Sequence, residues 1–188
     1  MEFSGIVLAG GASRRMGADK ATLVVDDAPL LTRVVRALRA AGADDVLVVG
    51  GDPAAADAAG GRFEADRWPG EGPLGGLITG LSMISTELAL VAACDLPDID
   101  PDIVHELTRA LDADAKLDAV VPTVDGRSQP LLAAYRRRCA DALVPAFAVG
   151  ERRLDEALHD LVVDRPLRDG TSFADLDTPS DLAARLRR

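Results

Sequence analysis

Aromatic side chains are scarce in this sequence of 188 residues: one Trp, one Tyr and four Phe make up 3% of the chain. The hydrophobic share is nevertheless 48%, so the core has to be built from Leu, Val, Ile and Ala. Aliphatic runs without aromatic anchors are typical of a buried parallel sheet rather than of a β-sandwich. The length favours one domain, and we expect a single α/β domain over 1–188.

Cysteine-rich patterns, long apolar runs and an excess of positive charge are also lacking. The two cysteines, Cys94 and Cys139, lie far apart without metal-ligand spacing, so we interpret them as reduced, buried thiols of a cytoplasmic protein. No apolar run reaches the ~18 residues of a membrane span, and no signal-peptide pattern is present, so we expect no membrane attachment. The net charge of −10 argues against nucleic acid as a partner, because nucleic-acid-binding domains have a basic surface.

Apolar runs of strand length alternate with segments of helical period along the chain. We expect strands at 5–8, 45–49, 88–93, 118–122, 131–135 and 161–163, and helices at 29–41, 73–84, 100–111, 139–147, 152–159 and 178–186. This order predicts a three-layer α/β/α sandwich around a Rossmann-like, mostly parallel sheet. The hairpin-type turn Asp125-Gly126 predicts one antiparallel strand, at 131–135. Ligands of such sheets bind beyond the carboxyl ends of the strands.

The first such end has the composition of a phosphate-binding loop. Residues 8–20 read Leu-Ala-Gly-Gly-Ala-Ser-Arg-Arg-Met-Gly-Ala-Asp-Lys. Glycines let backbone N–H groups approach an anion, and Arg14, Arg15 and Lys20 supply positive charge. The spacing from Gly11 to Lys20 fits neither the P-loop nor the G-x-G-x-x-G fingerprint. What remains is the type of loop found in nucleotidyltransferases, and the alternative is a surface loop with incidental basic residues.

Two aspartates are candidate magnesium ligands. Asp95 follows the entirely apolar strand 88–93, where a carboxylate is costly unless it is paired or binds a metal. Mg²⁺ takes few protein carboxylates and completes its coordination shell with water and phosphate oxygens. We therefore expect Asp95 to bind Mg²⁺ beside the first loop. The alternative is an Asp that caps the turn before Asp98. Asp177 is either a second ligand or the N-cap of the terminal helix.

A second glycine-rich segment predicts contact with a base. Residues 70–77 read Gly-Glu-Gly-Pro-Leu-Gly-Gly-Leu, and around Gly72, Pro73 and Leu74 the backbone can approach a flat ring closely. An ordinary turn before a helix is the alternative. Asp66, upstream of this turn, either accepts hydrogen bonds from a base amine or ribose hydroxyl or is a surface residue.

Basic and imidazole side chains elsewhere in the chain carry weaker signals. Arg152 and Arg153 are either part of a solvated charge run or grip a second phosphorylated substrate, which is the pterin in the interpretation below. His105 and His159 lie in predicted helices without partners at ligand spacing, so we interpret both as structural. The sequence has no arrangement typical of nucleophilic catalysis.

These motifs jointly resemble those of molybdenum cofactor guanylyltransferases. The matching segments appear in the family's order, at 8–20, 72–76, 94–97, 150–153 and 177–182, and span nearly the whole chain. The resemblance implies transfer of GMP from GTP to the terminal phosphate of molybdenum-molybdopterin, with release of pyrophosphate and Mg²⁺ as cofactor. Other molybdenum-cofactor biosynthesis proteins or acceptor molybdoenzymes are further expected partners.

The resemblance also implies roles for single residues. Those expected to hold GTP are Leu8, Ala9, Gly10, Gly11, Lys20, Asp66, Gly72, Pro73, Leu74 and Asp95, the first three through the main chain. The acceptor phosphate is already ionised at neutral pH and needs no strong base. Catalysis is then alignment and charge neutralisation, which we assign to Lys20, Arg15 and Mg²⁺ on Asp95.

The sequence departs from the family at two points. Val49-Gly50-Gly51 stands where the family can carry an Asn, and Asp177 stands where some members have Asn. Gly10-Gly11 resembles the guanylyl pattern more than the cytidylyl one, which tends to have Ala-Gly there. The alternatives are a molybdopterin cytidylyltransferase, a cobinamide-phosphate guanylyltransferase, or a non-catalytic nucleotide-binding protein.

Overall fold

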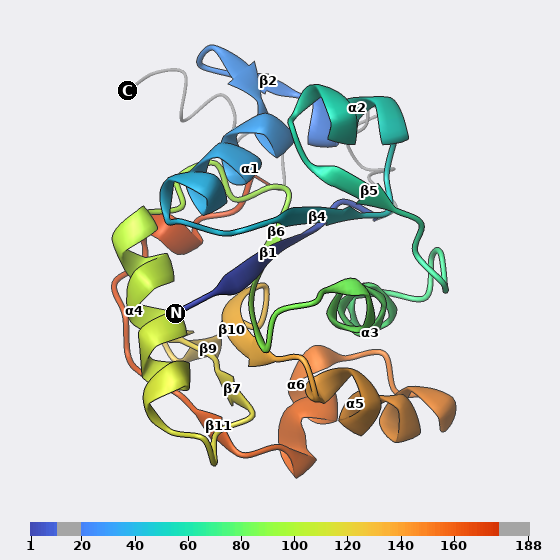
Figure 1. Cartoon of the computed structure of the whole chain (residues 1–188), viewed down its shortest axis with the longest axis vertical. Coiled ribbons are helices and arrows are strands. Elements are labelled where there is room, and N and C mark those ends of the chain that lie inside the picture. Colours follow the sequence, from blue (N-terminus) through green and yellow to red (C-terminus); the bar gives the residue numbers. More distant parts are fainter. Residues whose placement is uncertain (11–19, 177–188) are drawn as a thin grey trace.

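A seven-stranded sheet forms the centre of the computed structural model, which describes residues 1–10 and 20–176 (Figure 1). The order is β11-β7-β10-β6-β1-β4-β5. Its strands are β1 (Phe3–Leu8), β4 (Val46–Val49), β5 (Arg62–Glu64), β6 (Leu88–Ala93), β7 (Ala119–Val120), β10 (Leu132–Arg136) and β11 (Val163–Asp164). Of these, β10 alone runs antiparallel to its neighbours, as the sequence predicts.

Helices cover both faces of the sheet, which confirms the three-layer α/β/α architecture (Figure 1). The helices are α1 (Leu30–Ala40), α2 (Pro53–Ala58), α3 (Pro73–Met83), α4 (Pro101–Ala113), α5 (Cys139–Ala148) and α6 (Leu154–Ala157), with the 3₁₀ turns η1 (Lys20–Thr22), η2 (Leu158–Asp160) and η3 (Thr171–Phe173). One core packs α1, α2 and α4 on one face, and a second packs α3, α5 and α6 on the other. None of the helices in the described ranges is long and apolar enough to span a membrane.

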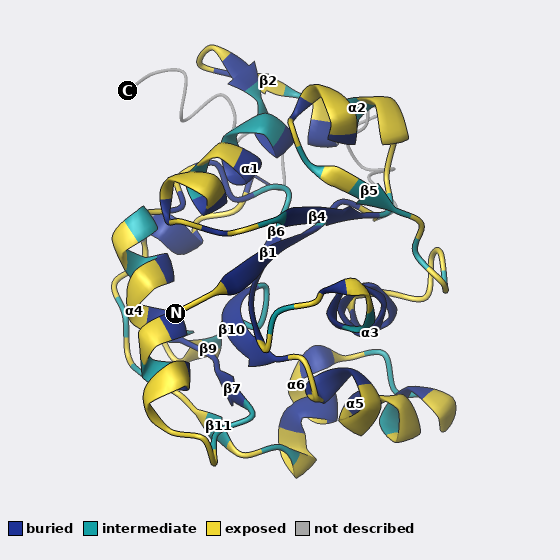
Figure 2. Cartoon of the chain, in the orientation of Figure 1, coloured by how far each residue is buried: buried dark blue, intermediate teal, exposed yellow. Residues whose placement is uncertain are grey.

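The two cores follow from the alternation of side chains along the central strands. In β1, Phe3 and Val7 join the first core, whereas Ile6 and Leu8 join or pack against the second. Because both faces are covered, the inner strands are buried along almost their whole length (Figure 2). Helix α3 lies so close to the sheet that a Cβ on Gly80 would be 2.7 Å from Ile6 Cγ2. A glycine at this helix position therefore permits the close packing.

Local signals placed several boundaries well. Helix α4 begins after Asp100, whose Oδ1 accepts a hydrogen bond from the Asp102 N–H at 2.9 Å, with Pro101 at the first helical position. This is the cap that the sequence predicts. The predicted helix 178–186 and the residues Gly11, Arg14, Arg15 and Asp177 lie outside the described residues.

Three expectations were wrong in detail. The Asp125-Gly126 turn joins β8 (Thr123–Val124) to β9 (Arg127–Ser128) in a separate two-stranded sheet, so it does not connect β7 to β10. The helix expected over 152–159 is only α6 followed by η2. Strand β5 and the hairpin of β2 (Val24–Val25) and β3 (Ala28–Pro29) were not predicted, because such short strands have no periodic pattern.

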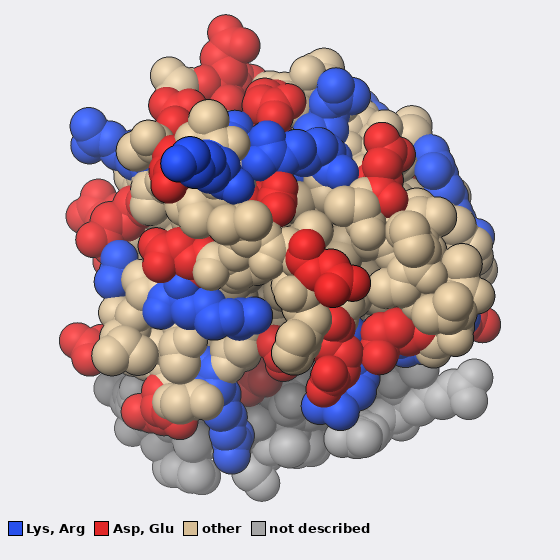
Figure 3. All heavy atoms as spheres, turned by 90° about the horizontal axis from the view of Figure 1, so that it is seen from below, with Lys and Arg blue, Asp and Glu red and all other residues tan. Residues whose placement is uncertain are grey.

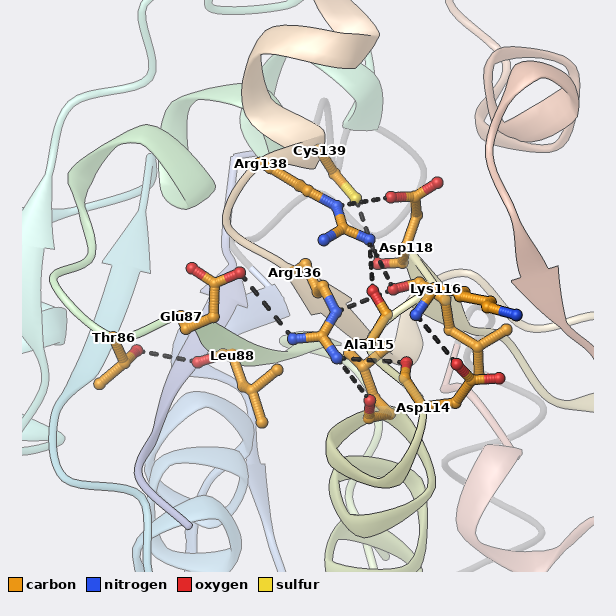
Figure 4. A network of polar contacts seen from close by, with 12 residues as sticks. Thr86, Glu87, Leu88, Asp114, Ala115, Lys116, Asp118, Arg136, Arg138 and Cys139 are labelled. Atoms are coloured by element: carbon orange, nitrogen blue, oxygen red, sulfur yellow. Dashed lines mark hydrogen bonds and ion pairs between the residues drawn. The ribbon is translucent and has the colours of Figure 1, made fainter.

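The amino edge of the sheet contains a network of polar contacts (Figure 4). Arg136, at the end of β10 and only 7% exposed, donates from Nε to the Leu117 carbonyl and from Nη2 to the Leu111 carbonyl, both at 2.8 Å. These carbonyls lie in the last turn of α4 and just beyond it. The guanidinium thus satisfies backbone groups that a helix end leaves without intrahelical partners.

The same edge holds one of the two thiols. Arg138 Nε donates to Asp118 Oδ1 at 2.8 Å, and Cys139 Sγ donates to the Asp118 carbonyl at 3.2 Å. Burial raises the pKa of Cys139 to about 12, so this thiol stays protonated at neutral pH. Of the two cysteines only Cys139 is buried; Cys94 is half-buried, because it lies beyond the last residue of β6.

Charge is mixed on the outer surface. On the face shown in Figure 3, Lys and Arg side chains intermingle with Asp and Glu, and neither sign gathers into one broad patch. His105 and His159 are both exposed, and His159 lies 4.0 Å from Glu156.

Candidate nucleotide-binding site

The carboxyl ends of four parallel strands meet at one edge of the sheet. The last residue of β1, Leu8, is the register partner of Val49 in β4 and of Ala93 in β6, and Val49 is the partner of Glu64 in β5. The segments that follow these strands therefore start side by side. This brings together the regions of Gly10, Asp66 and Asp95, which sequence motifs had singled out separately.

Glycine allows the loops after β1 and β4 to touch. The Ala9 and Gly10 N–H groups both donate to the Val49 carbonyl, at 2.9 and 3.2 Å. Gly50 has a φ of +72°, and a Cβ there would lie 2.8 Å from Gly10 Cα. Any side chain at this position would clash with the Gly10 backbone. At this point, where the family can carry an Asn, the backbone of Gly50 therefore contacts the backbone of Gly10, and Gly50 has no side chain to offer a ligand.

Asp66 lies beside this glycine pair and is held from one side. Its Oδ1 accepts hydrogen bonds from the Trp68 N–H at 3.0 Å and from Thr79 Oγ1 at 3.3 Å. Its Oδ2 points the other way: Cβ atoms built on Gly10 and Gly76 would lie 3.9 and 4.0 Å from it. No donor among the described residues binds Oδ2. Asp66 is thus half-buried and oriented, with one oxygen left toward the glycines.

Thr79 and Trp68 were not found by the sequence analysis. Thr79 is fully buried on α3, among apolar residues. A single polar residue on an otherwise apolar helix was the sequence signal that could have identified it. The Trp68 ring lies 4.8 Å from that of Phe147 in α5, centroid to centroid. These contacts fix the backbone between Asp66 and the start of α3.

The segment before α3 is joined to residues 151–153. Arg152 Nε donates to Glu71 Oε2 at 2.7 Å, and its Nη1 donates to the Phe147 carbonyl at 2.9 Å. The guanidinium also lies over the Phe147 ring, 4.0 Å from its centroid. Arg152 therefore ties α5 to the glycine-rich segment that begins at Gly70, and it has protein partners on several sides.

Arg153 has a different setting from Arg152. It is exposed and pairs with Glu156 one turn along, at 3.5 Å. The N–H groups of Arg153 and Arg152 donate to Glu151 Oε1, and these bonds hold the pKa of that carboxyl below its usual range. The carboxylate thus binds the backbone just before α6 begins.

Gly72, Pro73 and Leu74 form the start of α3. Gly72 is the N-cap residue with a φ of +89°, and Pro73 follows at the first helical position. Among the described residues, no side chain caps this end of the helix. The Leu74 side chain is buried in the second core, so only the backbone of Leu74 can contact a base at this turn.

Asp95 lies at the tip of the central strand β6. The preceding Cys94 N–H donates to the Leu8 carbonyl at 3.2 Å, and the Asp95 carbonyl accepts from the Leu176 N–H at 3.1 Å. The residue is half-buried. Within 1–10 and 20–176, no three His, Cys, Asp or Glu side chains gather into a ready metal cage. A single carboxylate fits Mg²⁺, which keeps several waters and takes phosphate oxygens as ligands. Lys20 is the first residue of η1.

A parallel sheet whose carboxyl edge combines touching glycine loops, an oriented aspartate and a second aspartate at the central strand defines a nucleotidyltransferase. The comparison with known families makes this specific. The chain belongs to the family of the MobA-like NTP transferase domain, whose model matches residues 5–163.

Individual relatives agree over nearly the whole length. A protein of Chloroflexus aggregans named "probable molybdenum cofactor guanylyltransferase" is 39% identical over 193 residues, covering 97% of this chain and 92% of the relative. One of Burkholderia vietnamiensis, named "molybdenum cofactor guanylyltransferase", is 36% identical over 200 residues, covering 99% and 96%. The crystal structure of molybdopterin-guanine dinucleotide biosynthesis protein A from Archaeoglobus fulgidus superimposes with a TM-score of 0.79 at 26% identity, covering 97% and 96%.

Proposed function

We propose that this protein transfers GMP from GTP to the terminal phosphate of molybdenum-molybdopterin, forming molybdopterin guanine dinucleotide cofactor and pyrophosphate. The near full-length identity to proteins named for this activity supports the proposal. The geometric observation that carries it is the Asp66 carboxylate, held through Oδ1 with Oδ2 directed at Gly10 and Gly76.

Hydrogen-bond polarity at this edge favours guanine. Guanine presents two neighbouring donors, its N1–H and 2-amino groups, and these need acceptors. The N–H groups of Ala9 and Gly10 are already bound to the Val49 carbonyl and are not available to a base, whereas Asp66 provides a carboxylate oxygen as acceptor. Cytosine presents acceptors beside its amino group and would leave part of this edge unpaired, which is costly in a desolvated site.

Asp95 is the residue proposed to hold Mg²⁺, which supplies neutralisation of charge on the α-phosphate and the leaving pyrophosphate. Lys20 and Arg15 are proposed to add positive charge on the same phosphates, and the backbone of the first loop to orient them. The attacking phosphate oxygen is ionised already, so no residue has to act as a general base. Alignment of two anions is the main task of the chain.

The remaining parts of the proposal concern the setting of the reaction. We place it in the cytoplasm, with other molybdenum-cofactor proteins or acceptor molybdoenzymes as partners that supply the pterin or receive the product. A molybdopterin cytidylyltransferase and a cobinamide-phosphate guanylyltransferase are the enzymes from which the proposal has to be distinguished.

Incubation of the purified protein with Mg²⁺, each labelled nucleoside triphosphate and molybdenum-loaded molybdopterin tests this function. We expect label to transfer from GTP only, with release of pyrophosphate. Transfer from CTP and not GTP would contradict the guanine assignment. A parallel reaction with cobinamide phosphate as acceptor should remain without product, and efficient transfer to it would contradict the acceptor.

A further inference from the structure

A cavity of about 460 Å³ lies between the β8–β9 hairpin and the segment 170–174. Val124 and Phe173 form its apolar lining, and Asp125, Arg127 and Gln129 contribute polar groups. The volume is within the range of about 300–1,000 Å³ that small-molecule sites occupy. None of the described residues assigned to GTP lines this cavity, so it is a candidate site separate from the nucleotide site.

Both walls of the cavity lead to the tip of β6. Gln129 comes two residues before Leu131, whose carbonyl accepts from the Ala93 N–H at 2.9 Å. On the other wall, Ala174 comes two residues before Leu176, whose N–H donates to the Asp95 carbonyl at 3.1 Å. The cavity and the nucleotide site thus adjoin Asp95 from opposite directions, since Asp66 and Gly10 lie toward β4 and β5.

The charged groups of the cavity are available, unlike those of residues 151–153. Arg127 is exposed and forms no ion pair with any residue in the described part of the chain. Arg152 and Arg153, by contrast, pair with Glu71 and Glu156. An unpaired guanidinium beside a carboxamide is a suitable binder of an anionic group, because Arg donates two parallel hydrogen bonds to phosphate.

The hairpin sets the order of these groups. Asp125 is at the turn, and Arg127 and Gln129 follow on the strand that runs back toward the sheet. Gln129 is therefore the nearest of the three in sequence to Leu131, which binds Ala93 at the end of β6, and Asp125 is the farthest from it. A carboxylate such as Asp125 accepts paired hydrogen bonds from an N–H beside an amino group, which is the polar edge of a pterin ring.

We propose that this cavity binds the acceptor of the transfer reaction, a pterin with a phosphate monoester. Its phosphate end lies toward Gln129 and Arg127, where the α-phosphate of the nucleotide is within reach of Asp95, and its pterin edge lies toward Asp125. The Phe173 side supplies apolar contact for the ring. This inference rests on the proposed function and replaces Arg152 and Arg153 as the expected pterin contacts.

The test measures acceptor binding and turnover separately in Arg127→Ala and Gln129→Ala. Fluorescence titration with molybdopterin in the absence of nucleotide should show binding weakened about tenfold in Arg127→Ala, the loss expected of one charge-assisted contact. The KM for molybdenum-loaded molybdopterin should rise similarly, while the dissociation constant for GTP stays within about twofold. Arg127→Lys should restore part of the affinity.

Arg165→Ala is the matched control. Arg165 touches the same hairpin, donating from Nη1 to Ser128 Oγ at 3.0 Å, but it does not line the cavity. It should leave acceptor binding unchanged. Unchanged acceptor binding and KM in Arg127→Ala would overturn the proposal, as would a rise of both confined to Arg152→Ala. Arg127-dependent binding without any GMP transfer by the wild type would contradict the proposed function and support the cavity.

Discussion

The two edges of the central sheet use charged side chains in opposite ways. At the amino edge, the Arg136 guanidinium donates to three carbonyls near the end of α4, and Arg138 binds Asp118 (Figure 4). At the carboxyl edge, Asp66 uses one carboxylate oxygen for the protein and leaves the other toward Gly10 and Gly76. Polar groups that are fully paired hold the fold, whereas half-paired, oriented groups are suited to a ligand.

The largest effect on function should come from Asp95→Ala at the carboxyl edge. Loss of the proposed Mg²⁺ ligand should lower GMP transfer by about 10³-fold or more, because one group that neutralises phosphoryl charge contributes several kcal/mol. The thermal midpoint should stay near the wild-type value, since Asp95 is half-buried at a strand end. Turnover comparable to that of the wild type would remove Asp95 from the metal site.

Arg136→Met should produce the largest effect on stability, at the opposite edge. Methionine fills much of the volume but removes the Arg136 donors to the Leu111 and Leu117 carbonyls, and the Leu117 carbonyl keeps only the bond from Arg138 Nη2. We expect a loss of about 3 kcal/mol in the free energy of unfolding, measured with urea. Arg138→Ala, nearly half exposed, is the matched control and should cost less than about 1 kcal/mol. Equal losses in both variants would contradict the structural role of Arg136.

Asp66→Asn tests the oxygen that is left for the base. Because Asn keeps Oδ1, the bonds from Trp68 and Thr79 can persist, while an NH₂ group replaces Oδ2. The KM for GTP should rise about 30-fold, the ratio that corresponds to about 2 kcal/mol. Thr79→Val, which removes the donor to Oδ1 and the acceptor of the Arg67 N–H but leaves Oδ2 in place, should change KM much less. If Asp66→Asn binds GTP as the wild type does, guanine recognition lies elsewhere.

The smallest effect should be a change in the pH dependence of stability. Burial raises the pKa of Cys139 to about 12, whereas the unfolded thiol ionises at about 8.5. The unfolded state therefore loses its proton first, and stability falls as pH rises above the unfolded pKa. The expected loss from this group between pH 8 and 9.5 is about 1 kcal/mol. Urea unfolding of Cys139→Ala should show a correspondingly flatter alkaline profile; an identical slope would show that Cys139 does not contribute.

Long periodic segments were predictable from sequence because burial imposes their pattern. Strand β6 matches the predicted 88–93 at both ends, and α4 starts at the predicted cap. Strand β5 was missed because three residues with a single apolar side chain form a strand only by pairing with β4. Its strand character depends on a neighbour that local sequence does not reveal.

The candidate site was predictable in its motifs but not in its connections. Gly10, Asp66 and Asp95 each follow a strand, and the sheet rule puts such ends at one edge. The close contact of Gly50 with Gly10 depends on the register of β1 and β4, which no local pattern specifies. The bond between Arg152 and Glu71 was not predictable, because the two residues are 81 positions apart in the chain.

The reversed strand β10 has a consequence for how such an enzyme can change. Because β10 runs against β6, the chain visits the carboxyl edge once on leaving β6 and again just before Leu132, after the hairpin. The proposed nucleotide residues follow the parallel strands, and the polar residues of the proposed acceptor site come from this later visit. The two halves of the site are thus encoded by separate stretches of sequence. If both proposals hold, substitutions in the hairpin alter acceptor choice while the proposed guanine-binding half is inherited unchanged.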